Sequence, residues 1–395
     1  MKDRLFILTN DPVPYGTANA NYIRNFAKAV ANEGWNVIII GMRSDDSQPD
    51  FYRIVDNDEN IQFWNFNATK WGGKNYLRSY FLYEKKYRSA MEQFDINERD
   101  YIFVYSTELD TAKAAIKTKK VPSKNKMYSE VEWFQPYQYR HGRFNPLYIL
   151  WKFGFQYRSK KFEKAIPISR NIEKYCISHD CKTLVVPALV DTCAEYPTNE
   201  YNRDSIIHFV YPGSASDKES FPCMIQALAE LTRGEKKKVR FHLTGSMSKE
   251  RLLQIGCDTN QLDSLDGVLV FHGWMEYNEL INLYQKSDYL LLARERNAVT
   301  ISNFPSKVPE MMCYGIIPVC SKVGDYTDLY LRDGFDSIQF YEDDVTECTA
   351  AIRRAIKVKE SHQSDQMKKN ARNTAVTYFD CRVWGRKITE FLKAN

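Results

Sequence analysis

The sequence lacks several features that define whole classes of protein. Its 395 residues include no apolar run near the ~20 residues that a membrane-spanning helix requires. None of the nine cysteines stands in a Cys-x-x-Cys pair, the spacing typical of zinc sites and redox motifs. Basic residues exceed acidic ones only slightly, 55 against 50, and no nucleic-acid-binding motif is present. These absences argue against a membrane-spanning protein, a zinc or redox module and a nucleic-acid partner.

The beginning of the chain and the cysteines both bear on the compartment. The first ten residues contain too short an apolar run for a secretion signal and predict a strand instead. Several cysteines lie in apolar runs, which favours buried free thiols and a reducing compartment. The nine include Cys176, Cys181, Cys223, Cys313 and Cys320. We therefore expect a cytoplasmic protein.

Predicted strands and helices alternate along the chain, which indicates parallel sheets. Each half begins with a strand, a glycine loop and a helix, at 5–9 and 19–32 in the first half and at 205–211 and 221–231 in the second. The polar segment 191–204 is the expected boundary. The pattern predicts an α/β fold of two Rossmann-like lobes facing across a cleft. Further strands are expected at 37–40, 101–105, 126–131, 165–169, 183–187, 239–243, 268–271, 289–293 and 316–320.

The segment 302–321 is the most informative part of the sequence. A polar loop is expected to end near Ser306, and a short helix follows with Pro309 in its first turn, where the missing N–H does no harm. Gly315 can end this helix in the left-handed conformation before a buried strand. Glu310 then lies in the first helical turn at the carboxyl edge of a sheet, where open α/β sheets bind ligands. Such a carboxylate can accept two ribose hydroxyls, while nearby backbone N–H groups hold phosphate.

This segment resembles the donor site of the retaining, nucleotide-sugar-dependent glycosyltransferases of the two-lobed GT-B fold, especially family 4. The signature of that family is Glu, seven residues, Glu, with Phe two places after the first Glu and a Gly and Pro-Val turn beyond the helix. Here Glu310 stands for the second Glu and Phe304 for the Phe. Ser302 replaces the first Glu, which in the family usually touches the transferred sugar. A Glu in a first helical turn also complements the helix dipole without binding anything.

The resemblance implies a chemistry that depends on stabilising the charge of a departing diphosphate. Lys218 follows the loop Gly213-Ser214 and is similar to the family's Gly-Arg-then-Lys loop, with Ser214 in place of the Arg. Arg294 lies just past a predicted strand, and we expect it to replace that lost Arg. The predicted catalytic residues are Lys218, Arg294 and Glu310, although Lys218 and Arg294 also suit ordinary charged loops.

The rest of the predicted donor site comes from turns and from the loop before Glu310. Glycine at position 16 would let the backbone of the first loop approach the ligand closely. The turn at Gly273-Trp274 is where such enzymes seat the base, and Asn297 and Ser302 would touch the sugar. The full predicted donor site is Gly16, Gly213, Ser214, Gly273, Trp274, Asn297, Ser302, Phe304, Ser306 and Glu310.

Three further residues are candidates for the acceptor or sugar side: Glu130 and Glu132, which end a predicted strand, and His141. Each also suits an ordinary structural or surface role. The Asp56-x-Asp58 pair matches the metal motif of the other main glycosyltransferase fold, but its polar surroundings predict a turn. We therefore expect no metal and no cofactor, the nucleotide sugar being a substrate.

Residues 140–164 interleave basic and aromatic side chains and contain one acid, Glu163. A helix of this kind can lie on an anionic bilayer, here the inner face of the plasma membrane, and it can equally be a core helix with a solvated basic face. In the resembling folds the last helix crosses back to the first lobe. The expected domains are 1–190 on the acceptor side, 205–375 for the nucleotide sugar, and a terminal helix within 376–395.

The function predicted from these residues is transfer of a hexose or hexosamine from a nucleoside-diphosphate sugar to a hydroxyl of a glycan or lipid-linked glycan, in cell-surface polysaccharide assembly. Two alternatives remain open at this point. A nucleotide-sugar epimerase or hydrolase of the same fold would bind the same donor, and a non-catalytic subunit would be consistent with the missing first Glu.

Overall fold

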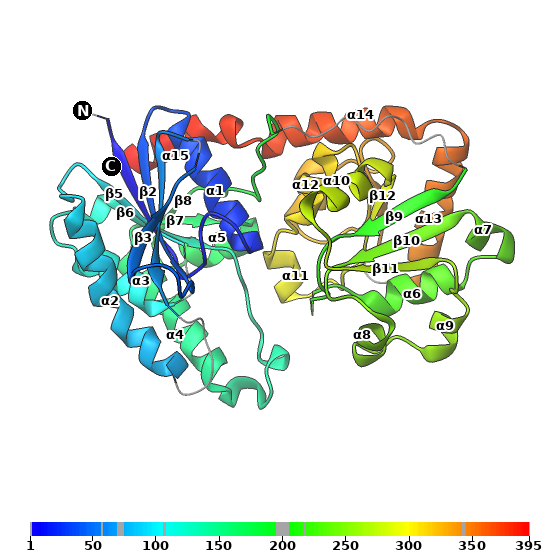
Figure 1. The fold of residues 1–395 in the computed structure, drawn as a ribbon, viewed down its shortest axis with the longest axis horizontal. Helices are drawn as coiled ribbons and strands as arrows, with labels where there is room; N and C mark the ends of the chain where they lie inside the picture. The colour runs from blue at the N-terminus through cyan, green and yellow to red at the C-terminus, as the bar shows by residue number, and fades with distance from the viewer. Residues whose placement is uncertain are drawn as a thin grey trace. The chain divides into compact units, whose positions relative to one another are not determined.

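The computed structural model describes residues 2–56, 58–68, 75–105, 108–194, 205–216, 218–341 and 344–394. The chain divides into two compact units, 1–191 with 380–395 and 192–379. Each unit contains one sheet with helices packed against it, and within each sheet the strands are parallel apart from one pair (Figure 1). The predicted α/β fold of two Rossmann-like lobes is thereby confirmed.

The sheet of the first unit has the order β3-β4-β2-β1-β5-β6-β7-β8. Its edge strand β3, which the sequence analysis missed together with β4, is antiparallel to β4. The strand expected at 183–187 is limited to β8, although Leu184 and Val186 still donate to backbone carbonyls of β7. The strands are β1 Arg4–Leu8, β2 Asn36–Arg43, β3 Phe51–Ile54, β4 Ile61–Asn67, β5 Tyr101–Val104, β6 Lys126–Glu130, β7 Lys164–Pro167 and β8 Lys182–Thr183.

The last helix of the chain, α15, packs on the first unit, as expected. Its Gly385 lies so close to α1 that an added Cβ would stand 2.4 Å from the carbonyl oxygen of Ala29. The buried Lys164 donates to the carbonyls of Leu392 and Ala394, which satisfies groups that the end of a helix leaves without partners. The helices of this unit are α1 Ala18–Ala31, α2 Asn75–Gln93, α3 Leu109–Lys117, α4 Pro146–Lys161, α5 Arg170–Ile177 and α15 Cys381–Lys393.

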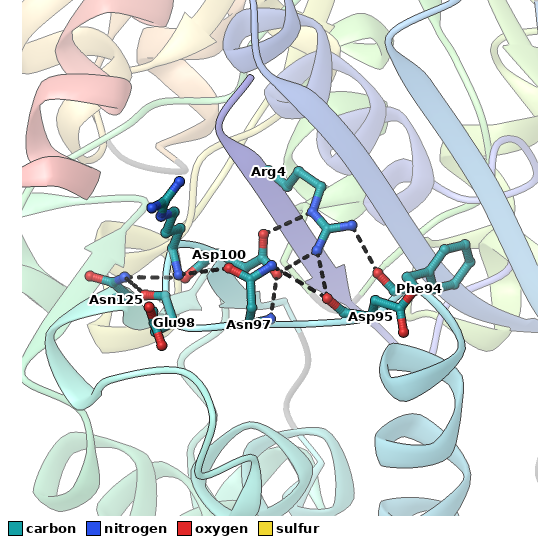
Figure 2. A network of polar contacts seen from close by, with 8 residues as sticks. Arg4, Phe94, Asp95, Asn97, Glu98, Asp100 and Asn125 are labelled. Atoms are coloured by element: carbon teal, nitrogen blue, oxygen red, sulfur yellow. Dashed lines mark hydrogen bonds and ion pairs between the residues drawn. The ribbon is translucent and has the colours of Figure 1, made fainter. Parts of the chain in front are cut away.

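The amino end of β1 is fastened to the loop before β5 by Arg4 (Figure 2). Its guanidinium donates two hydrogen bonds to the carboxylate of Asp100, at 2.8 and 2.7 Å, and further ones to the carbonyls of Phe94 and Asp95. Asp100 also accepts from the backbone N–H of Asn97. The buried carboxylate is thus fully engaged in holding two neighbouring strands of the sheet in place.

The sheet of the second unit has the order β11-β10-β9-β12-β13-β14 and is parallel throughout. Helices α6 and α13 pack together, and α12 and α14 contact β13. The strands are β9 Ile207–Tyr211, β10 Val239–Thr244, β11 Leu269–Gly273, β12 Tyr289–Leu292, β13 Ile317–Ser321 and β14 Ile338–Phe340. The helices are α6 Phe221–Ala229, α7 Arg233–Lys237, α8 Lys249–Gln254, α9 Thr259–Asp263, α10 Tyr277–Lys286, α11 Ala298–Ser302, α12 Lys307–Cys313, α13 Val345–Glu360 and α14 Ser364–Thr374.

The informative segment folds much as its sequence predicts. Pro309 lies in the first turn of α12, Gly315 has a φ of +72°, and β13 follows. The loop before α12 ends at Ser306, as expected, but it is preceded by a short helix, α11, that the sequence analysis missed. Asn297 caps that helix by accepting from the N–H groups of Val299 and Thr300.

Candidate functional site

The candidate site lies where the strand order of the second sheet reverses. From β9 the chain moves outward to β10 and β11 and then returns to β12 on the other side of β9. Loops after β9 and β12 therefore diverge at the carboxyl edge, the position where open α/β sheets bind ligands. Lys218 lies in the first of these loops and Arg294 in the second.

The loop after β9 begins with a glycine turn that another glycine makes possible. Gly213 has a φ of +88° and donates its N–H to Thr244 Oγ1 at 2.9 Å. Gly245, at φ +70°, lies against it, and a Cβ on Gly245 would meet the Gly213 carbonyl carbon at 3.0 Å. The hydroxyl of Ser214 is hydrogen-bonded to the hydroxyl of Ser246, which fixes the same turn from the β10 side.

Arg294 is the central cation of the site. It is 4% exposed, and its Nη2 donates to Glu219 Oε1 at 2.7 Å. Its Nε and Nη1 are buried, and no described residue accepts a hydrogen bond from them. Buried N–H donors without acceptors carry a desolvation penalty of about 1–3 kcal/mol each, more for charged groups. A ligand with anionic oxygens would satisfy them, and a guanidinium fork suits a phosphate particularly well.

Lys307 is the second cation of the site, and the sequence analysis missed it. It is the first residue of α12, and its Nζ lies 5.0 Å from the centre of the Tyr211 ring. Burial lowers the pKa of Lys307, while the charge of Glu219 opposes that shift. A lysine at a helix N-terminus is electrostatically unfavourable. That misplaced charge, three residues before Glu310, is the feature of the sequence that could have revealed it.

Glu219 holds the cations together. Burial by itself would raise its pKa, but the charges of Arg294 and Lys307, with hydrogen bonds from Ser216 and Arg294, bring the pKa down to about 2. Glu219 is therefore ionised at neutral pH. Lys218 is near enough for its charge to act on Lys307. The charges that act on Lys307 are those of Arg294, Lys218, Glu219 and Glu310. Three cations against two carboxylates leave an excess of positive charge, which suits a diphosphate.

Glu310 lies in the first turn of α12, beside aromatic side chains. The rings of Tyr284 and Tyr314 have their centres 5.1 Å apart. The pKa values of both tyrosines are raised, first by burial and also by the negative charge of Glu310. The turn after β11 provides Gly273, with a φ of +66°, and Trp274, which is 85% exposed. Lys307, whose pKa the charge of Glu310 also affects, connects this carboxylate with the cation cluster.

Other predicted donor residues are engaged locally. Ser302 donates to the carbonyl of Ala298 at 2.6 Å within α11. The amide of Asn297 donates to Glu295 while its oxygen caps α11. Phe304 is 7% exposed and packs edge-on against aromatic neighbours, and Ser306 immediately precedes α12. Contact of these residues with a sugar nucleotide stays a prediction.

The predicted residues of the first unit come from the end of β6 and the segment after it, and from the loop after β1. Glu130 is 1% exposed and accepts from Arg158 of α4 at 2.6 Å. Burial, only partly offset by Arg158, raises the pKa of Glu130 to about 7. Glu132 is half-buried, and His141 is exposed in a turn with a φ of +70°. Gly16, at φ +123°, lies in the loop between β1 and α1. An acceptor-side role for these residues stays a prediction.

The Asp56-x-Asp58 pair lies between β3 and β4, and Asp58 accepts from the N–H of Asn60 as in a turn; residue 57 lies outside the described residues. Within the described ranges, no group of three or more His, Cys, Asp or Glu residues is arranged to hold a metal ion. The helices of those ranges include none long and apolar enough to cross a membrane. The expectation of a metal-independent reaction stays a prediction.

Comparison with known proteins bears on the fold and on the family match of the second unit. Residues 199–374 match the family model described as glycosyl transferases group 1. Comparison with curated protein sequences gives no match. Among solved structures, sucrose-phosphate synthase from Thermosynechococcus elongatus is 13% identical, with a TM-score of 0.74 over 99% of this chain and 98% of that one. Anabaena HepE in complex with UDP-glucose is 14% identical, with a TM-score of 0.67 over 99% of each chain.

A third similar structure is the lipopolysaccharide outer core galactosyltransferase WaaB, 14% identical, with a TM-score of 0.62 over 98% of this chain and 99% of that one. At these identities the likeness establishes the fold, which is the GT-B fold. The second unit carries the match to the glycosyl transferases group 1 model. Fold and match together support a glycosyltransferase that uses a nucleotide sugar.

Proposed function

We propose that the protein is a retaining glycosyltransferase that moves a hexose or hexosamine from a nucleoside-diphosphate sugar to a hydroxyl of a glycan or lipid-linked glycan. The observation that carries the proposal is the buried guanidinium of Arg294, two of whose nitrogens have no acceptor among the described residues. With Lys218 and Lys307 it forms a cationic cluster at the strand-order reversal. The diphosphate of the donor supplies the missing acceptors.

We propose the following reaction for this arrangement. The bond between the anomeric carbon and the phosphate oxygen breaks, and a bond to the acceptor oxygen forms on the same face of the sugar. The departing phosphate oxygen takes the acceptor proton, so that no side chain acts as nucleophile. Arg294, Lys218 and Lys307 stabilise the charge that develops on the diphosphate, a role worth about 2.7–4 kcal/mol for a single donor in other enzymes. Glu310 binds the ribose hydroxyls, and no metal takes part.

The similar structures suggest which donor and acceptor to test first. HepE is described in complex with UDP-glucose, and WaaB as a galactosyltransferase of the lipopolysaccharide outer core. We therefore take UDP-hexoses as the first donors and lipid-linked glycans as the first acceptors, in cell-surface polysaccharide assembly. We propose that the protein acts in the cytoplasm, at the inner face of the plasma membrane.

The deciding experiment is thermal unfolding of the full chain with a panel of nucleoside diphosphates and their sugars. A ligand at about 100 times its dissociation constant adds roughly 2.7 kcal/mol to the stability of the native state. We expect a shift with the diphosphates of one base, lost in Glu310→Ala and kept in Glu92→Ala, an exposed acid on α2. No shift with any nucleotide would overturn the proposal and favour the non-catalytic subunit.

Product analysis then separates transfer from the other reactions of a nucleotide-sugar site. With the stabilising donor and a glycan acceptor, we expect a new glycosidic bond with the anomeric configuration of the donor sugar. Conversion of the donor to an epimer or a free sugar without acceptor would identify an epimerase or a hydrolase instead. A product of inverted configuration would contradict the retaining mechanism.

A further inference from the structure

One helix of the first unit exposes apolar side chains that its packing does not use. The buried face of α4 carries Trp151 and Phe155, 8% and 4% exposed. On the opposite face Ile149 and Phe153 are 51% and 55% exposed, and Phe144, just before the helix, is 73% exposed. The helix is therefore apolar on both sides. Exposed apolar clusters of this kind mark interaction sites.

The charged side chains of the same segment are almost all of one sign. Residues 140–164 contain a single acid, Glu163. Five of their basic residues are exposed, and no described carboxylate forms an ion pair with any of them. The guanidinium of Arg143 lies 5.2 Å from the centre of the Phe144 ring, so cation and apolar surface are interleaved. The exposed cations are Arg140, Arg143, Lys152, Lys160 and Lys161.

We propose that this face, formed by residues 140–161, docks on an anionic lipid bilayer. A helix of 16 residues is about 24 Å long and can lie in the plane of the interface. Phe144, Ile149 and Phe153 would enter the boundary between headgroups and acyl chains. The lysines bury their aliphatic stems there and place their ammonium groups among lipid phosphates. An acidic protein surface could form ion pairs with the cations, but it would not offer the exposed phenylalanines an apolar environment like the acyl chains of a bilayer.

Binding of the full chain to vesicles tests the proposal, and it needs no nucleotide sugar, so its result is independent of the proposed reaction. We expect sedimentation with vesicles of equal parts phosphatidylcholine and phosphatidylglycerol, and little with phosphatidylcholine alone. The triple variant Lys152→Gln/Lys160→Gln/Lys161→Gln should bind about tenfold more weakly or worse, since each cation near the surface contributes severalfold. Its matched control is Arg233→Gln/Lys237→Gln/Lys369→Gln, which removes three exposed cations from the second unit.

The apolar side chains are tested separately by Ile149→Ser/Phe153→Ser, with Leu253→Ser/Tyr341→Ser as the control for two exposed apolar residues of the second unit. We expect the first pair to weaken vesicle binding and the second to leave it unchanged. All four variants should unfold near the temperature of the parent, because the altered side chains are exposed. If the serine pair fails to fold, the lysine triple still decides.

Three results would overturn the proposal. The first is no binding to the anionic vesicles, and the second is equal binding to both vesicle types. The third is an equal loss of binding in a control variant and its test variant. If an acidic protein rather than a bilayer occupied this face, the anionic vesicles would fail to bind.

Discussion

Arg294 Nη2 lies 2.7 Å from Glu219 Oε1, and the two side chains are 5% and 1% exposed. The pair joins the loop after β12 to the loop after β9, across the point where the strand order reverses. It uses one nitrogen of the guanidinium and leaves Nε and Nη1 without an acceptor among the described residues. The carboxylate therefore orients Arg294 without exhausting its capacity to bind a diphosphate.

This pair predicts coupled effects on stability. Arg294→Met should lower the free energy of unfolding by about 3 kcal/mol, because it leaves Glu219 buried with weaker compensation. The double variant Glu219→Gln/Arg294→Met should recover a substantial part of that loss. Urea unfolding measures the two single variants Arg294→Met and Glu219→Gln, the double variant and the parent. Additive effects, within about 0.5 kcal/mol, would contradict the coupling.

The same variants separate stability from donor binding. Both chains that carry Arg294→Met should lose nucleoside-diphosphate affinity, including the stable double variant. Titration with the stabilising nucleotide provides the measurement. Parent-like affinity in the double variant would remove Arg294 from the donor site while leaving its structural role intact.

Lys307 predicts a weaker donor complex when its charge is removed. Lys307→Met should reduce nucleoside-diphosphate affinity about tenfold or more, which corresponds to about 1.4 kcal/mol. Lys322→Met, which alters an exposed lysine of the same unit, is the control and should bind normally. Isothermal titration compares the two. Equal affinities would show that Lys307 serves packing rather than the ligand.

We predict that the contribution of Asp110 to the free energy of unfolding falls as the pH rises. Burial and the charge of Glu108 raise the pKa of Asp110 from 3.8 to about 8. Hydrogen bonds from Thr111 and Asn10 oppose this shift without cancelling it. Between pH 3.8 and about 8 the folded state keeps a proton on Asp110 that the unfolded state has released. The contribution of Asp110 to the free energy of unfolding is therefore full below pH 3.8 and is lost as the pH rises toward 8. The contribution should change by about 1.4 kcal/mol per pH unit. Asp110→Asn should remove this slope in urea unfolding measured at several pH values, and an unchanged slope would contradict the assignment.

The close approach of the last helix to α1 leads us to predict that position 385 tolerates no side chain. A Cβ there would lie 2.4 Å from the Ala29 carbonyl oxygen and 3.0 Å from Glu33 Oε1. Gly385→Ala should lower the stability of the first unit by about 1–3 kcal/mol, despite the better helix propensity of alanine. Gly234→Ala in α7 is the control, because its nearest neighbour is 4.0 Å away, and it should be neutral or stabilising. Thermal unfolding that ranks the two variants in the opposite order would refute the close-packing argument.

Local sequence was sufficient for the elements whose causes lie within a few residues. Pro309 begins α12 and Gly315 ends it through backbone preferences alone, and apolar runs mark the buried strands. The strand–loop–helix alternation likewise determined the parallel sheets and the position of Glu310 in a first helical turn. The antiparallel edge strand β3 was missed, because its pairing with β4 decides its conformation. The helix α11 was also missed, and it depends on the cap at Asn297.

Only the tertiary structure decided which charges act together. Lys307 was missed, and the pairing of Glu219 with Arg294 was not foreseen, because their partners lie many residues away and meet only when β9 and β12 become neighbours. In the same way, the pairing of Glu130 with Arg158 depends on how α4 packs against its sheet. Backbone preferences act over one or two helical turns, whereas charges interact through space. The sequence therefore determined most of the elements and the location of the candidate site within them, and folding determined the electrostatics of that site.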